Sequence, residues 1–302
     1  MALSAKDKSI HCKGWDPDRE KRIAADQAKV FQTVGKNLKD ALKEAVLVLV
    51  TLPPQAFQAV LEEMKAAGMQ SVILVNLSTR QSAPAAWIES AFGADAPYVS
   101  MLPALNPACL DESAHERREA RADLFQGGRI YISASPRAAE GLLNLAIDLA
   151  VLLGGRPVFA EAGEVDGLAA ANQLLPELAA CALMNAVSGQ PSWRDGQLLA
   201  GAALARAGVL LDDLAAAEWA QIALADSQNS LRVLDDLGGV LRKMRQALLD
   251  QDQAALEDLL YDSQSARADW LERRRKDPAA GQLATSEPSE KDALKNFLKL
   301  GQ

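Results

Sequence analysis

The chain has 302 residues, a length that predicts about two domains of ~100–200 residues each. Its composition, 49% hydrophobic and 24% charged, is that of an ordinary soluble globular protein. The net charge of −8 argues against nucleic acid or an anionic membrane as the main partner, so small molecules and proteins remain. No apolar run approaches the ~20 residues of a membrane span and no secretory signal is visible, so we expect a cytoplasmic location.

Cysteine and histidine are scarce. The cysteines, Cys12, Cys109 and Cys181, are far apart without CxxC spacing, which favours neither a disulfide framework nor a zinc site. Of the two histidines, His11 falls in a predicted strand and is interpreted as structural. His115 lies in a charged stretch that we expect to be a solvated helix or loop. Few side chains are therefore available for acid–base chemistry.

The first informative stretch is IHCKGWDPDRE, residues 10–20. It reads as a short strand that ends near the acidic Asp16, as the second strand of a dinucleotide-binding unit does. In that fold a GxGxxG turn lies roughly twenty residues upstream. Only residues 1–9 precede the stretch here. We predict a Rossmann-like sheet lacking its first strand and Gly-rich loop, and we expect the native chain to begin upstream of Met1 with both.

Between residues 10 and 161, β-branched runs alternate with helical patterns, which indicates parallel βαβ units. Strands are predicted at 45–52, 71–78, 98–102, 129–135 and 156–161. Turns rich in Pro, Ser or Asn follow several of them, where an open α/β sheet places its ligand. One helix is predicted over 55–68, and another begins at Ser135-Pro136 and ends at Gly154.

After about residue 163 the strand signal ends, and we predict an all-helical domain over 164–275 and a polar tail over 276–302 that is mobile or docks. A long helix is predicted over 165–187. A second helix carries apolar residues whose spacing mostly alternates between three and four, namely Leu231, Leu234, Leu237, Leu241, Met244 and Leu248. This spacing favours packing in a bundle or across a dimer seam.

A set of segments occurs in order along nearly the whole chain. It comprises KGWDPD, EAVLVLVTLPP, ADLFQGGRIYIS, LLGGRPVFAEAGEVDGLAAANQLLPELAACALMNAV, EWAQIALADSQNSL and LLDQDQAALEDLLYDSQSARADWLERR. In this order and spacing the sequence resembles the prephenate and arogenate dehydrogenases of tyrosine biosynthesis.

The resemblance implies a Rossmann-like domain over 1–163 and a helical dimerisation domain over 164–275, and hence a homodimer. It also implies an oxidoreductase that transfers a hydride from a cyclohexadienyl substrate to NAD or NADP with loss of carbon dioxide. MALSAK, residues 1–6, resembles the end of the helix that the Gly-rich loop opens.

Cofactor contacts are implied at two turns. The carboxylate of Asp16 could accept the ribose hydroxyls and would favour NAD over NADP. The alternative is that Asp16 caps a helix whose first residue is Pro17. Leu52 and Pro53 resemble the turn along the cofactor, and alternatively they only terminate a strand.

Substrate contacts are implied in the run NLSTRQ, residues 76–81. Ser78 stands at a family serine that helps to position the substrate and a catalytic histidine, so it is the candidate catalytic residue and a further candidate cofactor contact. Arg80 stands at a family lysine and is a candidate substrate contact. Alternatively, Ser78 is only a helix cap.

The histidines of the family are replaced in this chain. Leu102, before Pro103, stands at the family histidine that takes the substrate's hydroxyl proton, and a leucine accepts no proton. Leu174 and Glu177 stand at two further histidines. Arg206 is the poorly aligned candidate for gripping a substrate carboxylate. The sequence thus leaves two hypotheses open: an NAD(P)-dependent dehydrogenase, or a non-catalytic dimeric relative that acts as a binding or regulatory protein.

Overall fold

The structure is a computed structural model that describes Leu3 and residues 6–69, 71–110, 121–212, 215–276 and 288–301. The chain divides into two compact units. Unit 1 comprises 1–169, 214–226 and 288–302, and unit 2 comprises 170–213 and 227–287. The division differs from the predicted one, because the first boundary falls after residue 169 and unit 1 also includes 214–226 and the end of the tail.

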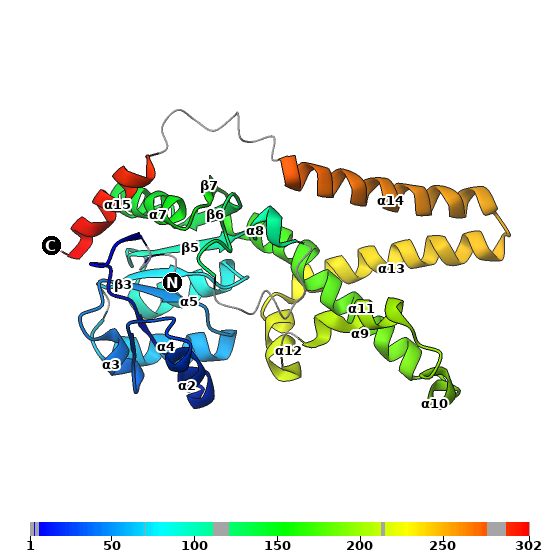
Figure 1. Cartoon of the computed structure of the whole chain (residues 1–302), viewed down its shortest axis with the longest axis horizontal. Helices are drawn as coiled ribbons and strands as arrows, with labels where there is room; N and C mark the ends of the chain where they lie inside the picture. Colours follow the sequence, from blue (N-terminus) through cyan, green and yellow to red (C-terminus); the bar gives the residue numbers. More distant parts are fainter. Residues whose placement is uncertain are drawn as a thin grey trace. The chain divides into compact units, whose positions relative to one another are not determined.

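Unit 1 is built on a five-stranded sheet in the order β3-β4-β5-β6-β7 (Figure 1). Its strands are β3 (Leu47–Val50), β4 (Ile73–Asn76), β5 (Tyr98–Pro103), β6 (Arg129–Ala134) and β7 (Arg156–Phe159). The five predicted strands are confirmed. Neighbouring strands are parallel except for β5 and β6, which are antiparallel, so the expectation of parallel units throughout is wrong at that pair.

A separate two-stranded parallel sheet contains β1 (Lys13–Gly14) and β2 (Thr33–Val34). Helices α2 (Arg19–Gln27) and α3 (Leu38–Leu42) accompany it. A dinucleotide fold has the strand order 3-2-1-4-5-6. In that numbering, β2 and β1 correspond to strands 3 and 2, and β3, β4 and β5 correspond to strands 4, 5 and 6. Among the described residues, no strand takes the place of strand 1 by pairing with both β1 and β3.

One face of the five-stranded sheet is covered by α4 (Pro54–Ala66) and α5 (Ser82–Phe92). The predicted apolar stripe of α4 is buried: Phe57, Val60, Leu61 and Met64 pack with Leu74 and Tyr98 of the sheet. The rings of Phe57 and Trp87 lie 5.9 Å apart and join the two helices.

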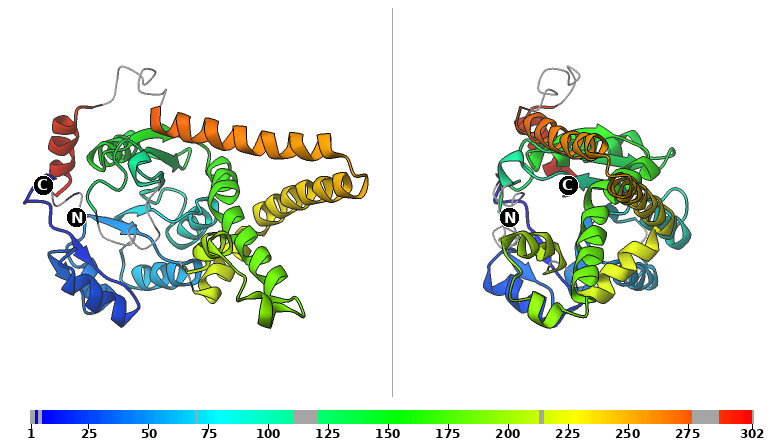
Figure 2. Two further views of the ribbon diagram at one scale, coloured as in Figure 1. Left: turned by 45° about the vertical axis from the view of Figure 1, so that its right-hand side comes forward. Right: turned by 90° about the vertical axis from the view of Figure 1, so that its right-hand side faces the viewer.

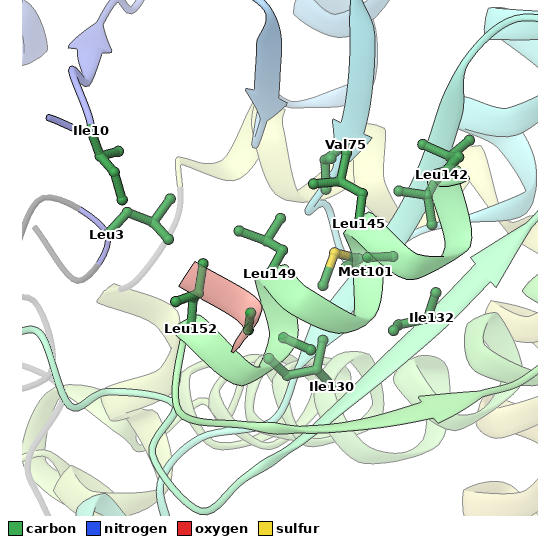
Figure 3. Close-up of a cluster of buried hydrophobic side chains, with 14 residues drawn as sticks. Leu3, Ile10, Val75, Met101, Ile130, Ile132, Leu142, Leu145, Leu149 and Leu152 are labelled. Carbon is green, nitrogen blue, oxygen red and sulfur yellow. The ribbon is translucent and has the colours of Figure 1, made fainter. Parts of the chain in front are cut away.

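The other face is covered by α7 (Glu140–Leu152). Because side chains alternate along a strand, Val75 and Val99 point to this face while their neighbours Leu74 and Tyr98 point to the first. Figure 3 shows Val75 beside the leucines of α7, which are Leu142, Leu145, Leu149 and Leu152.

The start of α7 was predicted wrongly. Ser135 and Pro136 form a turn, in which the amide of Ala138 donates to the carbonyl of Ser135 at 2.9 Å, and the helix begins only at Glu140. The predicted end is confirmed, because Gly154 adopts φ +79°, a conformation that favours glycine.

The C-terminal helix α15 (Glu290–Leu298) packs beside α7 within unit 1 (Figure 2). Ala293 is fully buried in the contact, and Glu290 forms an ion pair with Lys6 at 2.7 Å. The carboxyl of Asp148 on α7 is hydrogen-bonded to Asn296. The last part of the predicted tail is therefore docked.

Helix α8 (Ala162–Ala169) contacts α5, and α12 (Ala216–Ala225) contacts α4, both within unit 1. Beyond α8 the helix continues into unit 2 as a π-helical turn, η2 (Ala170–Leu174), and then as α9 (Leu175–Ser188). Pro176 has no N–H and therefore cannot donate a helical hydrogen bond to the carbonyl one turn earlier, in η2. This missing bond is a local reason for the π-helical turn.

The described part of unit 2 is entirely helical. Besides η2 and α9 it contains α10 (Trp193–Gly196), α11 (Ala202–Gly208), η3 (Val209–Asp212), α13 (Ser227–Leu249) and α14 (Gln253–Lys276). Helices α13 and α14 form an antiparallel hairpin (Figure 1). Among the described residues one continuous helix, Ala162–Ser188, is long and apolar enough to cross a membrane; this is weak evidence, because core helices of soluble proteins meet the same criterion.

Candidate functional site

The candidate site lies at the carboxyl end of β4, where Asn76 organises the following turn. The Asn76 side chain is 1% exposed. Its Nδ2 donates to the carbonyl of Arg80 at 2.9 Å and to Ser100 Oγ at 3.1 Å. Its Oδ1 accepts from the backbone N–H of Ser78 at 3.0 Å. Every polar atom of this amide is thus used to hold the turn after β4 against β5.

Ser78 is held inside the same turn. Its hydroxyl lies 2.7 Å from Asn76 Oδ1 and 2.8 Å from the carbonyl of Arg80, both of which are acceptors. A hydroxyl has a single proton, so it can satisfy only one of them fully at a time. In this conformation the proton of Ser78 is directed to the turn.

Arg80 is buried, with 4% of its surface exposed. Its Nη1 lies 3.3 Å from Asp226 Oδ2, at the end of α12, and donates to the carbonyl of Asp166 at 3.2 Å. The side chain therefore ties the turn after β4 to α8 and α12. An ion pair this deeply buried requires its partner, because an unpaired charge in that position costs about 3–5 kcal/mol.

Asp166 of α8 caps helix α5. Its carboxylate accepts from the backbone N–H of Gln81 at 2.6 Å and of Ser82 at 3.0 Å. The first N–H groups of a helix have no acceptor within the helix, and they form the positive end of the helix dipole. The alternative interpretation of Ser78 as the cap is wrong, because a carboxylate from α8 has this role.

Gln81 completes the network. Its Oε1 accepts a hydrogen bond from Ser133 Oγ on β6, and Ser133 is also 2.9 Å from the carbonyl of Ala160. Among the described residues, Gln81 Nε2 and Arg80 Nε are buried and make no hydrogen bond. Both atoms are hydrogen-bond donors, so a further group that binds to this network would have to be a hydrogen-bond acceptor.

Leu102 lies near the end of β5 in an apolar cluster and is 9% exposed. It packs with Val165 and Ala169 of α8, and it pairs with Tyr131 across the β5–β6 ladder. The only side chain of this cluster that can hold or release a proton is the phenol of Tyr131. In the described part of the chain, this cluster contains no histidine and no carboxylate.

Asp16 follows β1, and its hydrogen bonds do not fit the alternative interpretation in which it caps a helix that begins at Pro17. Its Oδ1 accepts from the backbone N–H of Asp18 at 2.8 Å. Helix α2 begins at Arg19, and Asp18 caps it by accepting from the N–H of Glu20 at 2.7 Å. Pro17 is thus not the first helical residue, and Asp16 is not the helix cap.

Leu52 and Pro53 lie between β3 and α4. Pro54 is the first residue of α4, and Pro53 occupies the cap position without a side-chain hydrogen bond. This turn follows a strand end on the same edge of the sheet as the turn after β4. Leu52 and Pro53 therefore follow the carboxyl end of β3, and Ser78 follows that of its parallel neighbour β4. Asp16 follows the carboxyl end of β1, in the separate two-stranded sheet.

The remaining predicted residues are placed elsewhere. Arg206 is exposed on α11 of unit 2, where Leu174 is buried and Glu177 is half-buried. His11 is exposed and precedes β1, so it is not in a strand as expected. His115 lies outside the described residues. Within the described ranges, no cluster of His, Cys, Asp or Glu could hold a metal ion.

Sequence reasoning missed Asp166 and Asp226. They lie far along the chain from the turn they stabilise, since Asp166 is 85 positions after Gln81, and each sits in an ordinary helical pattern without a local signal. Only the packing of α8 and α12 within unit 1 brings them to Arg80 and Gln81.

No protein-family model matches the sequence, and neither does any curated protein. The fold is similar to that of solved dehydrogenases. Prephenate dehydrogenase from Aquifex aeolicus, in complex with hydroxyphenyl propionate and NAD+, matches with a TM-score of 0.75 and 14% identity over 89% of this chain and 92% of that one. Arogenate dehydrogenase from Synechocystis matches with a TM-score of 0.66 and 16% identity over 89% and 94%. The predicted fold class, a Rossmann-like α/β domain with a helical domain, is confirmed.

Proposed function

We propose that the chain binds a nicotinamide dinucleotide along the carboxyl ends of β1, β3 and β4. The observation that carries this proposal is that Leu52-Pro53 and Ser78 follow the carboxyl ends of the parallel neighbours β3 and β4, where an open α/β sheet places its ligand. Asp16 follows β1, a strand of the separate two-stranded sheet. The Aquifex protein of similar fold holds NAD+.

The residues present fit such a cofactor. Asp16 is half-buried, and its Oδ1 is the atom that accepts from Asp18, so Oδ2 can accept ribose hydroxyls. A carboxylate at this position disfavours the additional phosphate of NADP, so we expect a preference for NAD. Leu52 and Pro53 offer a flat apolar surface beside the strand ends.

The activity we infer from this fold is that of a dehydrogenase acting on prephenate, arogenate or a related cyclohexadienyl acid in the cytoplasm. A bound dinucleotide would supply the hydride acceptor. The residues of this chain would bind and orient the reactants. Asp16 would bind the ribose of the dinucleotide, and the turn that contains Ser78 and Arg80 would line the sheet edge beside the bound cofactor. The fold of two relatives that are themselves a prephenate and an arogenate dehydrogenase supports this proposal.

A second candidate, a non-catalytic binding or regulatory protein, is favoured by the surroundings of Leu102. That residue stands where the family has its proton-accepting histidine, and it packs among Val165 and Ala169. The buried cation nearby, Arg80, is already paired with Asp226. A substrate with two carboxylates requires cationic partners, so these features count against turnover while leaving dinucleotide binding intact.

For either candidate we also propose a homodimer formed through helices of unit 2. Several leucines of this unit are exposed, among them Leu231, Leu241 and Leu248 of α13. Soluble monomers rarely expose contiguous apolar surface of this kind.

Titration calorimetry with NAD and NADP tests the cofactor proposal. We expect NAD to bind the wild-type chain more tightly than NADP. Asp16→Asn should weaken NAD binding by roughly tenfold and so reduce the difference in affinity between NAD and NADP. Asp26→Asn, an exposed carboxylate in α2, is the matched control and should leave both affinities unchanged. If neither nucleotide binds, the proposal fails.

Turnover then separates the two candidates. The wild-type chain is incubated with NAD and either prephenate or arogenate, and NADH is followed by absorbance. Reduction of NAD would support the dehydrogenase and show that a group other than residue 102 takes the proton. NAD binding without reduction would support the non-catalytic protein.

A further inference from the structure

Two arginines lie side by side on the sheet of unit 1. Arg129 is the first residue of β6, and Arg156 is the first residue of β7. The two strands are parallel, and their register pairs Arg129 directly with Arg156. Because neighbouring strands lie ~4.8 Å apart and paired residues point to the same face of a sheet, the two side chains leave the backbone next to each other.

The alternation of side chains along β6 fixes the face on which this arginine pair lies. Ile130 and Ile132 are fully buried in the cluster beneath α7 (Figure 3). Arg129 and Tyr131 therefore point to the opposite face. On that face Tyr131 packs with Leu102, its partner across the β5–β6 ladder. The arginine pair thus shares a face with the residue at the family histidine position.

The pair also lies at the edge of the sheet that carries the proposed dinucleotide site. Strand β6 is antiparallel to β5, and β7 is parallel to β6, so the first residues of β6 and β7 lie at the carboxyl ends of β3, β4 and β5. The backbone N–H of Ala104, just after β5, donates to the carbonyl of Arg129 at 2.7 Å. An open α/β sheet places its ligand at this edge.

The charges of the pair favour an anion between them. Two cations on paired residues of neighbouring strands repel each other. Both side chains are half-buried, so water and salt screen this repulsion incompletely. Among the described residues, the guanidinium of Arg129 forms no hydrogen bond or ion pair. A guanidinium has five N–H donors, so an arginine that already makes one contact can still bind an anion.

We propose that Arg129 and Arg156 bind a carboxylate group of the substrate. This inference rests on the proposed function only for the class of substrate, a cyclohexadienyl acid. The two oxygens of a carboxylate match the planar fork of a guanidinium, and such pairs form two parallel hydrogen bonds. Arg80 is already paired with Asp226, whereas the pair on β6 and β7 supplies the cations that an acidic substrate requires.

The order of the strands fits a substrate of this class. The proposed dinucleotide site follows β3 and β4, Leu102 is near the end of β5, and the arginine pair begins β6 and β7. In prephenate the carboxylates belong to the ring carbon opposite the one that bears the hydroxyl group and gives up the hydride. A ring placed at the end of β5 therefore turns its hydroxyl-bearing carbon to the cofactor and its carboxylates to the arginines.

Binding of a simple acid tests the pair without turnover. The probes are 4-hydroxyphenylacetate and the neutral 4-hydroxyphenylacetamide, which differ only at the carboxylate. Calorimetry measures both with the full chain, in the presence and absence of NAD. The wild type should bind the acid at least roughly tenfold more tightly than the amide, because the amide cannot form the charged bonds to arginine. Equal affinities, or no binding of the acid, would overturn the proposal.

Substitutions then assign the binding to the two arginines. Arg129→Gln and Arg156→Gln should each weaken binding of the acid by roughly tenfold to a hundredfold and leave binding of the amide unchanged. Arg137→Gln is the matched control, because Arg137 is exposed and lies beyond the other end of β6. An equal loss of acid binding in the control would reflect only the net charge of the protein and would contradict the assignment.

Thermal unfolding separates a ligand site from a structural role. Without ligand, Arg129→Gln should melt at or above the temperature of the wild type, because it removes the repulsion within the pair. Saturating acid should raise the melting temperature of the wild type more than that of the variant. A lower melting temperature of Arg129→Gln without ligand, together with an unchanged affinity for the acid, would show that the arginine is structural.

The affinity for NAD distinguishes this inference from the cofactor proposal. Arg129→Gln and Arg156→Gln should bind NAD as the wild type does, because β5 separates the pair from the turn of Ser78. Weaker NAD binding in both variants would mean that the pair holds the phosphates of the dinucleotide, and the carboxylate assignment would be wrong. If the wild type binds the acid through the pair but does not bind NAD, the cofactor proposal fails and the carboxylate site stands.

Discussion

Asp166, Arg80 and Asp226 link three segments of unit 1, and the first two are buried while the side chain of Asp226 is 15% exposed. Asp166 satisfies two backbone N–H groups of α5, and Arg80 binds both the Asp166 carbonyl and the Asp226 carboxylate. A hydrogen bond to a charged acceptor contributes about 1.5–3 kcal/mol to the free energy of unfolding, more than a hydrogen bond between neutral groups does. At the scale of single residues, this network holds the candidate site in its shape.

Asp166→Asn should therefore lower the free energy of unfolding by about 1–3 kcal/mol, because an amide has one oxygen and its NH₂ group faces the second N–H donor. Urea unfolding at neutral pH measures the change. Glu161→Gln, at an exposed carboxylate near the start of the same helix, is the matched control. Equal stability of the two variants would contradict the role assigned to Asp166.

At the scale of elements, the contact between α15 and α7 joins two helices that are far apart in the sequence. Asp148 of α7 is 5% exposed and is hydrogen-bonded to Asn296 of α15. Burial raises the pKa of the Asp148 carboxyl above 3.8, although the hydrogen bond from Asn296 opposes the shift. The folded state thus holds the proton more tightly than the unfolded chain does.

A raised pKa means that Asp148 favours folding below pH 3.8 and loses that contribution as the pH rises through the raised value. At pH 7 the buried charge is unfavourable, so Asp148→Asn should raise the free energy of unfolding by about 0.5 kcal/mol or more, since an amide can keep the bond to Asn296. Thermal melts at pH 7 test this, with exposed Asp95→Asn as control. A lower melting temperature for Asp148→Asn would show that the charge itself holds α15.

At the scale of the whole molecule, the two units differ in how much apolar surface they bury. The hydrophobic clusters of unit 1 cover both faces of its sheet. In unit 2, α14 has no buried residue along its 24 positions and α13 has three. A unit with so little interior of its own gains stability from a partner that binds only its folded form.

If the homodimer proposed through unit 2 forms, calorimetry should resolve a transition whose midpoint depends on protein concentration. A tenfold higher concentration should raise that midpoint by about 3–6 °C, while the transition of unit 1 stays constant. Leu241→Asp should abolish the dependence, and Leu198→Asp should keep it. Identical midpoints at all concentrations for wild type would argue against stabilisation of unit 2 by self-association.

The sequence by itself determined the elements and much of the fold class. The apolar runs at 45–52 and 71–78 predicted strands and the stripe of Phe57, Val60, Leu61 and Met64 predicted the covered face of a helix, because periodicity is a local property. The run 45–52 is less buried than a central strand, since β3 lies at the edge of its sheet and Leu49 is 39% exposed. The sequence also identified Leu102 as a residue unable to accept a proton, which is a matter of side-chain chemistry alone.

Tertiary structure decided the rest, because it depends on which distant segments meet. The antiparallel pairing of β5 and β6 and the capping of α5 by Asp166 have no local signal. The same is true of the leucines of α13: their spacing predicted an apolar face, but the packing of unit 2 buries Val233 and leaves Leu231, Leu241 and Leu248 exposed. Spacing fixes which side chains share a face, and only the surrounding helices fix which face is covered.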